Sequence, residues 1–180
     1  MSRPFYFCVT YCLLIIGNCF SVTQLQKGRL LKTLPKQEIE WKMSFELEAF
    51  GRNAGWTNVI QFVDSGTTSD STTIPGARTP AIFLKGSDIY LCFNTDARLN
   101  TFHKQHIPLD QKIEYIMEQV LVPPSQNPII RIWVDGQKVY ERTHNLRIPF
   151  IGVRCYISSP WFTSSPVYVS NFEYIDFNME

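Results

Sequence analysis

Acidic side chains recur at even-numbered positions of one segment, at Glu38, Glu40, Glu46 and Glu48. Two carboxylates on one face of a strand can cleave glycosidic bonds, one as general acid and the other as base or nucleophile. The odd-numbered positions between them are apolar: Ile39, Trp41, Met43, Phe45 and Leu47. The acids therefore lie opposite the core, and we favour a solvated strand face over a hydrolytic site.

Histidines offer a second chemistry, because His103 and His106 are three residues apart. One helical turn would bring such a pair to one metal ion. Phe102 and Pro108 instead favour a loop, and no cysteine or acid nearby completes a zinc-binding set. We expect these histidines to be solvated loop residues.

Aromatic and planar polar side chains in expected loops suit ligand binding better than catalysis. Aromatic faces stack on sugar rings, while arginine, asparagine and aspartate hydrogen-bond to hydroxyl groups. Neither a Gly-x-Ser-x-Gly turn nor a glycine-rich phosphate loop is present, so no catalytic residue is expected. The candidate ligand-binding residues are Trp161, Arg78, Asn94, Asp96, Trp56 and Phe162.

The same side chains also have a purely structural interpretation. Trp56 and Trp161 would then close the ends of a sandwich as core residues, and Arg78 would be a structural hydrogen-bond donor. Trp133 poses a similar choice, because it lies on the face opposite its apolar neighbours and is either exposed or covered.

Calcium is the cofactor that the sequence leaves open. It prefers several oxygen ligands, often aspartate side chains together with loop carbonyl groups. Asp64, Asp70, Asp88 and Asp96 fall at expected strand ends or in loops, but they share no fixed spacing. No metal ligand is therefore assigned.

Strands are the elements that must position these side chains. Apolar residues alternate with period two along the chain, a pattern that one face of a helix cannot produce. Asp135-Gly136 lies between two such runs and predicts a hairpin with a type I′ turn. The segment 111–122 fits a helix by its charges and a strand by its alternation. The expected strands are 30–34, 39–47, 58–63, 81–84, 89–94, 113–122, 130–134, 151–158 and 167–177.

These strands, with short turns and no clear helix between them, predict an all-β fold. An antiparallel sandwich is the architecture that pairs distant strands and buries the aromatic side chains.

The N-terminus has the features of a secretory signal peptide. Arg3 precedes an apolar run, 5–16, and small or polar residues follow up to Ser21. The run is shorter than the roughly 20 residues that span a membrane; an uncleaved anchor is the alternative. We predict a leader at 1–21, one domain at 22–180, and a secreted, extracellular protein without stable membrane insertion.

Loss of the leader would equalise the charges. The full chain has 17 Lys and Arg against 16 Asp and Glu, and Arg3 is the cation that leaves. A near-neutral protein has no field of one sign to attract nucleic acid, so we expect no nucleic-acid partner.

Cysteine usage suggests one crosslink. Of five cysteines, only Cys92 and Cys155 lie outside the leader. In an exported domain such a pair suggests a disulfide, here closing a loop of about 63 residues and contributing roughly 4 kcal/mol. Two buried free thiols are the alternative.

Several short motifs follow one another between Gly28 and Tyr174. They are Gly28-Arg29-Leu30-Leu31, Trp41 to Leu47, Gly55 to Phe62, Arg78 to Phe83, Cys92-Phe93-Asn94-Thr95, Val134-Asp135-Gly136 and Ser159-Pro160-Trp161-Phe162. In this order they resemble the laminin G-like modules of invertebrate extracellular proteins, within the broad concanavalin A-like lectin and glucanase class. Their order carries the resemblance, because no single motif is specific.

The resemblance implies a jelly-roll sandwich of two antiparallel sheets in a secreted or matrix protein. It also implies recognition of glycans or matrix proteins, in some cases with calcium. Hydrolytic members of the class carry an aspartate between two glutamates, whereas no third acid follows Glu46-Leu47-Glu48. This departure argues against hydrolysis.

Three functions remain in order of preference. The first is a secreted, non-catalytic recognition or adhesion domain that binds carbohydrate on a cell surface or in the matrix, favoured by a groove lined by Trp161, Arg78 and Asn94. The second is a structural matrix or secretion component with protein–protein contacts, favoured by an exposed aromatic patch around Trp133. The third is a glycan-active hydrolase. The oligomeric state stays open.

Overall fold

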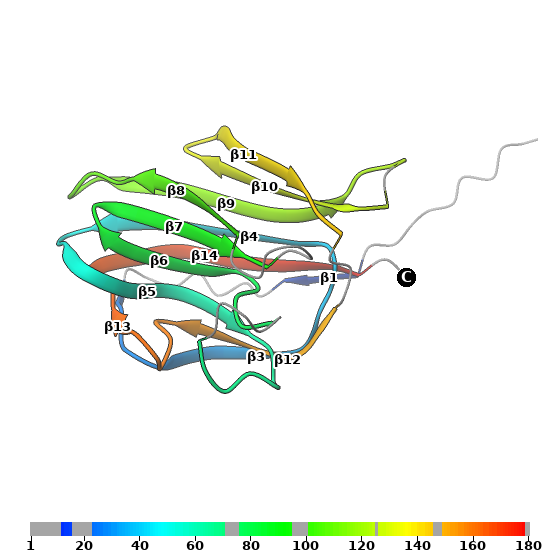
Figure 1. Cartoon of the computed structure of the whole chain (residues 1–180), viewed down its shortest axis with the longest axis horizontal. Coiled ribbons are helices and arrows are strands. Elements are labelled where there is room, and N and C mark those ends of the chain that lie inside the picture. The colour runs from blue at the N-terminus through cyan, green and yellow to red at the C-terminus, as the bar shows by residue number, and fades with distance from the viewer. Residues whose placement is uncertain are drawn as a thin grey trace, which may run out of the picture.

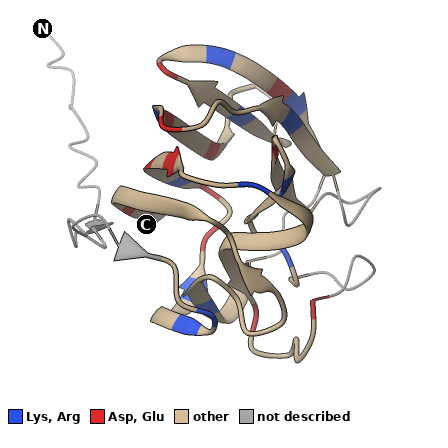
Figure 2. Ribbon diagram, turned by 90° about the vertical axis from the view of Figure 1, so that its left-hand side faces the viewer, with Lys and Arg blue, Asp and Glu red and all other residues tan. Residues whose placement is uncertain are grey.

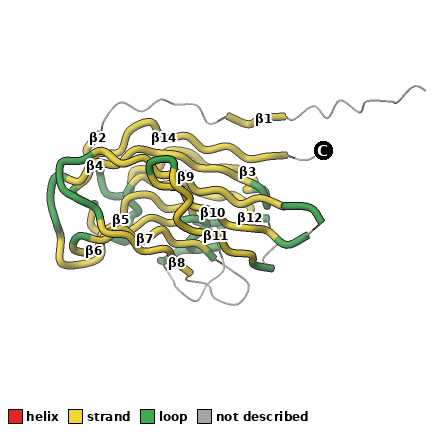
Figure 3. The backbone as a smooth tube through the Cα atoms, turned by 90° about the horizontal axis from the view of Figure 1, so that it is seen from above, coloured by secondary structure: helices red, strands yellow, loops and turns green. Residues whose placement is uncertain are grey.

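The computed structural model describes residues 12–15, 23–70, 76–94, 101–124, 126–145 and 149–178. Strands and loops make up these residues, and Figure 3 shows no helix among them. No segment of this part of the chain therefore forms a helix suited to crossing a bilayer. The all-β prediction is confirmed.

Two sheets of seven strands each form a sandwich (Figure 1). Sheet A has the order β1 (Cys12–Ile15), β14 (Val167–Asn178), β4 (Trp41–Ala49), β9 (Lys112–Leu121), β10 (Pro128–Val134) and β11 (Gln137–Thr143), with β2 (Thr23–Gln24) beside β14. Sheet B has the order β3 (Arg29–Gln37), β12 (Phe150–Ile157), β5 (Asn53–Val63), β6 (Ala81–Gly86), β7 (Asp88–Phe93) and β8 (Thr101–His106), with β13 (Thr163–Ser164) beside β5. Each recorded pairing is antiparallel except the short one between β13 and β5.

The main core lies between the two sheets and is built by alternation. In β4 every second side chain is buried, as the sequence predicts, and Phe45 stacks on Tyr115 of β9 with ring centres 5.3 Å apart. The ambiguous segment 111–122 is a strand, β9, because its alternate residues fill this core. Burial of each large apolar side chain stabilises the fold by about 1.5–3 kcal/mol.

The hairpin between β10 and β11 turns at Asp135-Gly136 as predicted. Both residues have positive φ, 48° and 76°, which is the conformation of a type I′ turn. A glycine at the second position adopts it without steric cost.

The outer faces of the two sheets differ in character. On sheet A the outer face carries several charged side chains, some of them ion-paired, as Arg131 is with Glu118 and Glu141 at 3.3 and 2.9 Å. On sheet B, residues 57–63 of β5 and 81–84 of β6 are buried on both faces. Sheet B therefore carries a second apolar layer outside the main core.

The predicted disulfide between Cys92 and Cys155 is wrong, because both cysteines are free and buried. Cys155 is paired in register with Phe62, whose side chain lies in the main core. Cys92 is paired with Ala81, which is paired with Gln61. Paired residues share a face and consecutive residues do not. The two sulfur atoms therefore lie on opposite faces of sheet B.

The predicted leader lies mostly outside the described residues. Its segment Cys12–Ile15 forms β1, which pairs antiparallel with β14 from Ile175 to Asn178 at the edge of sheet A. A four-residue strand at an edge contributes few of the hydrogen bonds of the sheet. The domain boundary at residue 22 stays a prediction.

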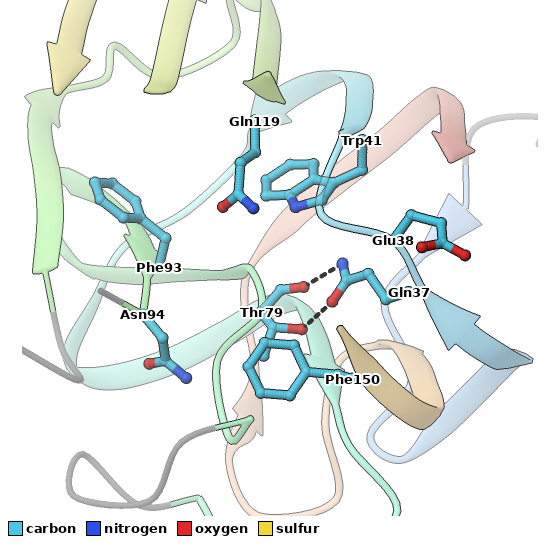
Figure 4. A pocket seen from close by; sticks show the side chains of 8 residues that line it. All are labelled: Gln37, Glu38, Trp41, Thr79, Phe93, Asn94, Gln119 and Phe150. Atoms are coloured by element: carbon cyan, nitrogen blue, oxygen red, sulfur yellow. Dashed lines mark hydrogen bonds between the residues drawn. The ribbon is translucent and has the colours of Figure 1, made fainter. Parts of the chain in front are cut away.

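A chain of buried hydrogen bonds joins the two sheets at one end of the sandwich. Gln37 Nε2 donates to Tyr174 Oη at 3.0 Å, and the Tyr174 hydroxyl donates to Asp176 Oδ1 at 2.7 Å. Gln37 also pairs with Thr79, donating to its carbonyl oxygen at 2.6 Å and accepting from its hydroxyl (Figure 4). These hydrogen bonds link β14 and β3 to the segment before β6.

Asp176 makes this linkage sensitive to pH. Burial raises the pKa of its carboxyl to about 6, against hydrogen bonds from Tyr174 and the backbone amide of Glu38 that lower it. Among charged neighbours, Glu38 raises this pKa and Lys32 lowers it. In the unfolded chain the carboxyl titrates near 3.9. The folded state therefore holds the proton more tightly than the unfolded state.

We predict that the free energy of unfolding falls as the pH rises from 4 to 6, by about 3 kcal/mol from this group. The contribution is complete below pH 4, where both states are protonated, and is lost above the folded pKa. Asp176→Asn keeps an acceptor for Tyr174 but cannot ionise, so this decline should disappear. Urea denaturation at a series of pH values measures it.

The matched control for this experiment is Asp88→Asn. A hydrogen bond from Lys104 lowers the pKa of the half-buried Asp88 from its ordinary value, so this group does not gain a proton between pH 4 and 6 and the decline should persist. Equal slopes in the wild type and Asp176→Asn would show that Asp176 is not the group responsible.

Candidate functional site: an aromatic cavity

A cavity of about 280 Å³ opens on the outer face of sheet B. Such a volume is close to the lower limit of small-molecule sites, which occupy about 300–1,000 Å³ and are mostly apolar with a few polar groups. Its lining is of this kind and consists of Trp56, Arg78, Phe83, Tyr90, Cys92, Phe102 and Phe162.

The register of four neighbouring strands places the side chains of this cavity together. Phe83 of β6 is paired with Tyr90 of β7, and Cys92 of β7 with Phe102 of β8. Phe83 and Cys92 are only 1% and 2% exposed and form the floor. Trp56 of β5 and Phe102 are 44% and 46% exposed and form opposite rims. The cavity therefore spans the sheet from β5 to β8.

Ring contacts hold the aromatic side chains at defined angles. The rings of Trp56 and Tyr90 meet at 60° with centres 4.6 Å apart, and Phe102 lies tilted against Tyr90 at 5.4 Å. Phe162 packs edge-on against Phe83 at 5.0 Å. Such arrangements contribute about 0.5–1.5 kcal/mol per pair beyond the burial of area. The rims are thus pre-positioned by their neighbours.

One guanidinium group forms the polar part of the wall. Arg78 lies over the Phe83 ring, with Cζ 4.7 Å from its centre. Its Nε and Nη2 donate to the two carboxylate oxygens of Asp70 at 3.0 and 2.6 Å. Gln61 Nε2 also donates to Asp70, at 2.8 Å. A two-pronged pair of this kind fixes the plane of the guanidinium group.

The loop that carries Asp70 is held at two further points, by the turn between β12 and β13 and by β12 itself. Trp161 Nε1 donates to the carbonyl oxygen of Thr68 at 3.1 Å. The Arg154 guanidinium donates to the carbonyl oxygens of Asp64 and Thr67. Trp161 therefore acts on the cavity indirectly, because it holds the loop from which Asp70 reaches Arg78.

Cys92 is a floor residue and not a nucleophile. Burial raises the pKa of its thiol to about 12, and the nearby Arg78 only partly opposes this. The reactive form of cysteine is the thiolate, which is almost absent at neutral pH with such a pKa. The thiol therefore contributes shape and apolar surface to the cavity.

Two lysines border the exposed rings. Lys85 Nζ lies 5.3 Å from the centre of the Trp56 ring, and Lys104 Nζ lies 5.7 Å from that of Tyr90. Lys104 also pairs with Asp88 at 2.7 Å. Although charges of both signs are interspersed over the molecule (Figure 2), no carboxylate lines this cavity among the described residues.

The structure brings together three of the six predicted binding residues: Trp56, Arg78 and Phe162 all line the cavity. Trp161 lies outside the lining and packs edge-on against Tyr156 with ring centres 6.0 Å apart. The groove of Trp161, Arg78 and Asn94 that would favour a lectin is not found in the hollows described for these residues, because Arg78 lines the aromatic cavity and Asn94 a different one. Asp96 lies outside the described residues.

Asn94 belongs to a different hollow, at the end of the sandwich where Gln37 meets Thr79 (Figure 4). This hollow holds about 20 Å³, which is room for roughly one water molecule. Asn94 is almost fully buried, at 4% exposure. The separation from the aromatic cavity arises because Asn94 follows the end of β7, whereas Tyr90 and Cys92 lie within it.

Four lining residues were absent from the sequence-based set: Phe83, Tyr90, Cys92 and Phe102. A signal for the first three was available. Residues 81–84 and 89–93 are apolar or aromatic without the polar alternate positions of β4, which is typical of strands buried on both faces. Phe102 had no such signal, because charged and polar residues follow it in the edge strand.

The loop prediction for His103 and His106 is wrong, because both lie in β8. In a strand, residues three positions apart point to opposite faces. His103 contacts the ring of Tyr140, with centres 5.6 Å apart, whereas His106 is exposed beside Asp88. The pair therefore cannot bind one metal ion.

Of the four aspartates considered for calcium, the three that lie within the described residues have other partners. Asp64 accepts a hydrogen bond from the Thr67 hydroxyl at 2.6 Å, Asp70 binds Arg78, and Asp88 binds Lys104. Within the described ranges, no group of three or more histidine, cysteine or acidic side chains is arranged to hold a metal ion.

The acidic face of sheet A forms a separate hollow of about 180 Å³, lined in part by Glu46, Glu114 and Glu173. Hydrogen bonds from Ser170, Asn171 and Lys112 lower the pKa of Glu46. Glycosidic cleavage needs one carboxyl that stays protonated, and Glu46 is held ionised instead. The outward position of this acid agrees with the solvated face predicted from alternation.

No protein-family model matches the sequence, that of laminin G modules included, and no curated protein is similar to it by sequence. Solved structures do resemble the fold. The receptor-binding domain of botulinum neurotoxin type G superposes with a TM-score of 0.54 at 7% identity, over 95% of this chain and 44% of that one. A heptameric SAP-like pentraxin from Limulus polyphemus gives 0.55 at 16% identity, over 90% and 75%.

A mutant Trypanosoma rangeli sialidase with trans-sialidase activity gives a TM-score of 0.50 at 14% identity, over 78% of this chain and 21% of that one. The chain spans less than half of the neurotoxin domain that it matches. At such identities the likeness concerns the fold alone. The chain has a jelly-roll β-sandwich fold, which these solved structures share.

We predict that Asp70→Asn destabilises the fold by roughly 3 kcal/mol, because it leaves the Arg78 guanidinium without its counter-charge in a mostly buried setting. The Asp70 and Arg78 side chains are 7% and 11% exposed. Guanidinium chloride denaturation measures the change. In the control Glu141→Gln, two solvent-accessible pairs are lost, with Lys138 and with Arg131, which keeps its pair with Glu118, and the expected cost is below about 1 kcal/mol. Equal losses would refute a structural role for the buried pair.

Proposed function

We propose that the chain is a non-catalytic recognition domain that binds carbohydrate through the aromatic cavity of sheet B. The observation that carries the proposal is the cavity itself, in which aromatic rings from β5 to β8 surround an apolar floor beside one fixed guanidinium group. Partners are expected on a cell surface or in the extracellular matrix.

The composition of the lining suits the two faces of a sugar ring. The C–H faces of a pyranose are apolar and stack on aromatic rings, which Trp56 and Phe102 present at the rims. Hydroxyl groups accept hydrogen bonds from planar donors, and Arg78 is such a donor in the wall. The aromatic contacts supply area while the polar group orients the ligand.

The fold neighbours support a binding role in general terms. A receptor-binding domain and a pentraxin share the sandwich, although fold by itself does not determine function. The alternative of a matrix protein acting through an aromatic patch has less support, because Trp133 is half-buried beside the ion pairs of sheet A.

The first test is a glycan-array screen of the purified full chain, followed by titration of the best ligand through tryptophan fluorescence. Trp56→Ala should weaken binding roughly tenfold, because it removes one stacking surface. Trp133→Ala is the matched control, since Trp133 lies on sheet A, and it should bind as the wild type does. A folded protein that binds no glycan would reject the proposal.

Two further arms of the same screen address calcium and hydrolysis. Binding should persist in chelator, because aromatic rings, a thiol and a guanidinium group are not ligands for a hard cation. Bound oligosaccharides should be recovered intact, without new reducing ends. Cleavage that depends on Glu114 or Glu173 would instead establish the hydrolase.

We also propose that the protein is exported and that its leader ends at Ser21. The cationic start and the short apolar run support this. Expression of the full sequence in a secretory cell line should yield protein in the medium that begins at Val22, as N-terminal sequencing would show. Retention in the membrane fraction with an intact N-terminus would contradict export.

A further inference from the structure

We propose that the ligand of the aromatic cavity is a terminal sugar that carries a negative charge, such as a carboxylate or a sulfate. This inference rests on the proposed carbohydrate binding and specifies its chemical class. It is carried by the size of the cavity and by the cations that border it.

The size of the cavity favours one ring over an extended chain. Its volume of about 280 Å³ lies at the small end of ligand sites, and Trp56 and Phe102 stand at opposite rims. Arg78 and Phe162 border it as well, from outside the four strands that form its floor. A ring can enter such a space from its free end, whereas a chain that continues at both ends needs an open groove.

The cations that border the cavity favour a negative charge on that ring. Lys85 and Lys104 lie over the adjoining rings of Trp56 and Tyr90, whose centres are only 4.6 Å apart. Neither lysine lines the cavity itself, but both ammonium groups lie against rings that do. Attraction between exposed opposite charges is modest, but it adds to the stacking that positions the ring.

The two nearby aspartates, Asp70 and Asp88, do not neutralise all of the positive charge around the cavity. Asp70 is occupied by Arg78, inside the wall. Asp88 is paired in register with both Lys85 and His106, but its carboxylate is engaged by Lys104 at 2.7 Å and by His106 at 3.7 Å. Lys85 is thus the cation of this face that no carboxylate of the described residues engages, and it is the expected partner of the anionic group.

The experiment compares three methyl glycosides that share one ring: methyl glucoside, methyl glucuronoside and methyl glucoside 6-sulfate, each titrated by protein-observed NMR. At least one acidic sugar should bind more tightly than the neutral one, and added sodium chloride should reduce the difference. The carboxylate and the sulfate arms distinguish the two sources of charge. A disaccharide with the acid at its free end should bind, and one with the acid capped should not.

Lys85→Gln keeps the length of the side chain and removes its charge. It should weaken acidic sugars roughly three- to fivefold and leave the neutral sugar unchanged. Lys138→Gln, on the other sheet, is the matched control and should have no effect.

The outcomes separate the two proposals. Equal binding of neutral and acidic sugars, lost in Trp56→Ala, would overturn the acidic specificity and keep the carbohydrate site. Binding of internal and terminal acids alike would overturn the requirement for a free end. Absence of binding to any sugar would overturn both.

Discussion

Burial of sheet B on both of its faces is the constraint on which the rest of the molecule depends. A strand presents alternate side chains to opposite sides, so a strand that is apolar at every position needs two apolar layers. Residues 81–84 form such a segment, and residues 57–63 are also buried on both faces, although Thr57, Asn58 and Gln61 among them are polar. The main core covers the inner side, and aromatic side chains with the segments around Arg78 and Trp161 cover the outer side. Sheet A differs, because its outer face carries ion pairs such as those of Arg131 with Glu118 and Glu141.

The candidate site is a consequence of this outer layer. Aromatic side chains that cover a sheet leave a hollow where they fail to close, and Trp56 and Phe102 remain half-exposed at its rims. The polar groups around it also stabilise the structure. Arg78 is bound by Asp70, and Asp70 sits on a loop that Trp161 holds. The Arg78 guanidinium therefore pairs with Asp70 in the same position in which it lines the cavity, so a structural role and the proposed binding role are compatible.

Local patterns predicted well wherever neighbours in the sequence decide the structure. The alternation of β4 and the Asp135-Gly136 turn are of this kind, since period and turn chemistry act over a few residues. β8 escaped prediction because its residues after Phe102 are charged or polar, and its pairing with β7 supplies what its sequence lacks. Three of the proposed binding residues meet in the cavity, but the strand register that unites them with Tyr90 and Phe102 is a long-range property.

The sequence by itself determined that the chain is an all-β sandwich, that Cys155 points inward and that the acids of β4 point outward. The reason is that the alternation of apolar and polar side chains is a property of consecutive residues. Only the tertiary structure decided which side chains and segments pack against those strand faces. Cys92 and Cys155 are separated by the thickness of sheet B, and Asn94 and Arg78 belong to different hollows. The physical reason is that a strand specifies which side chains share its face, while the strand order and the segments that cover the sheet specify what that face meets.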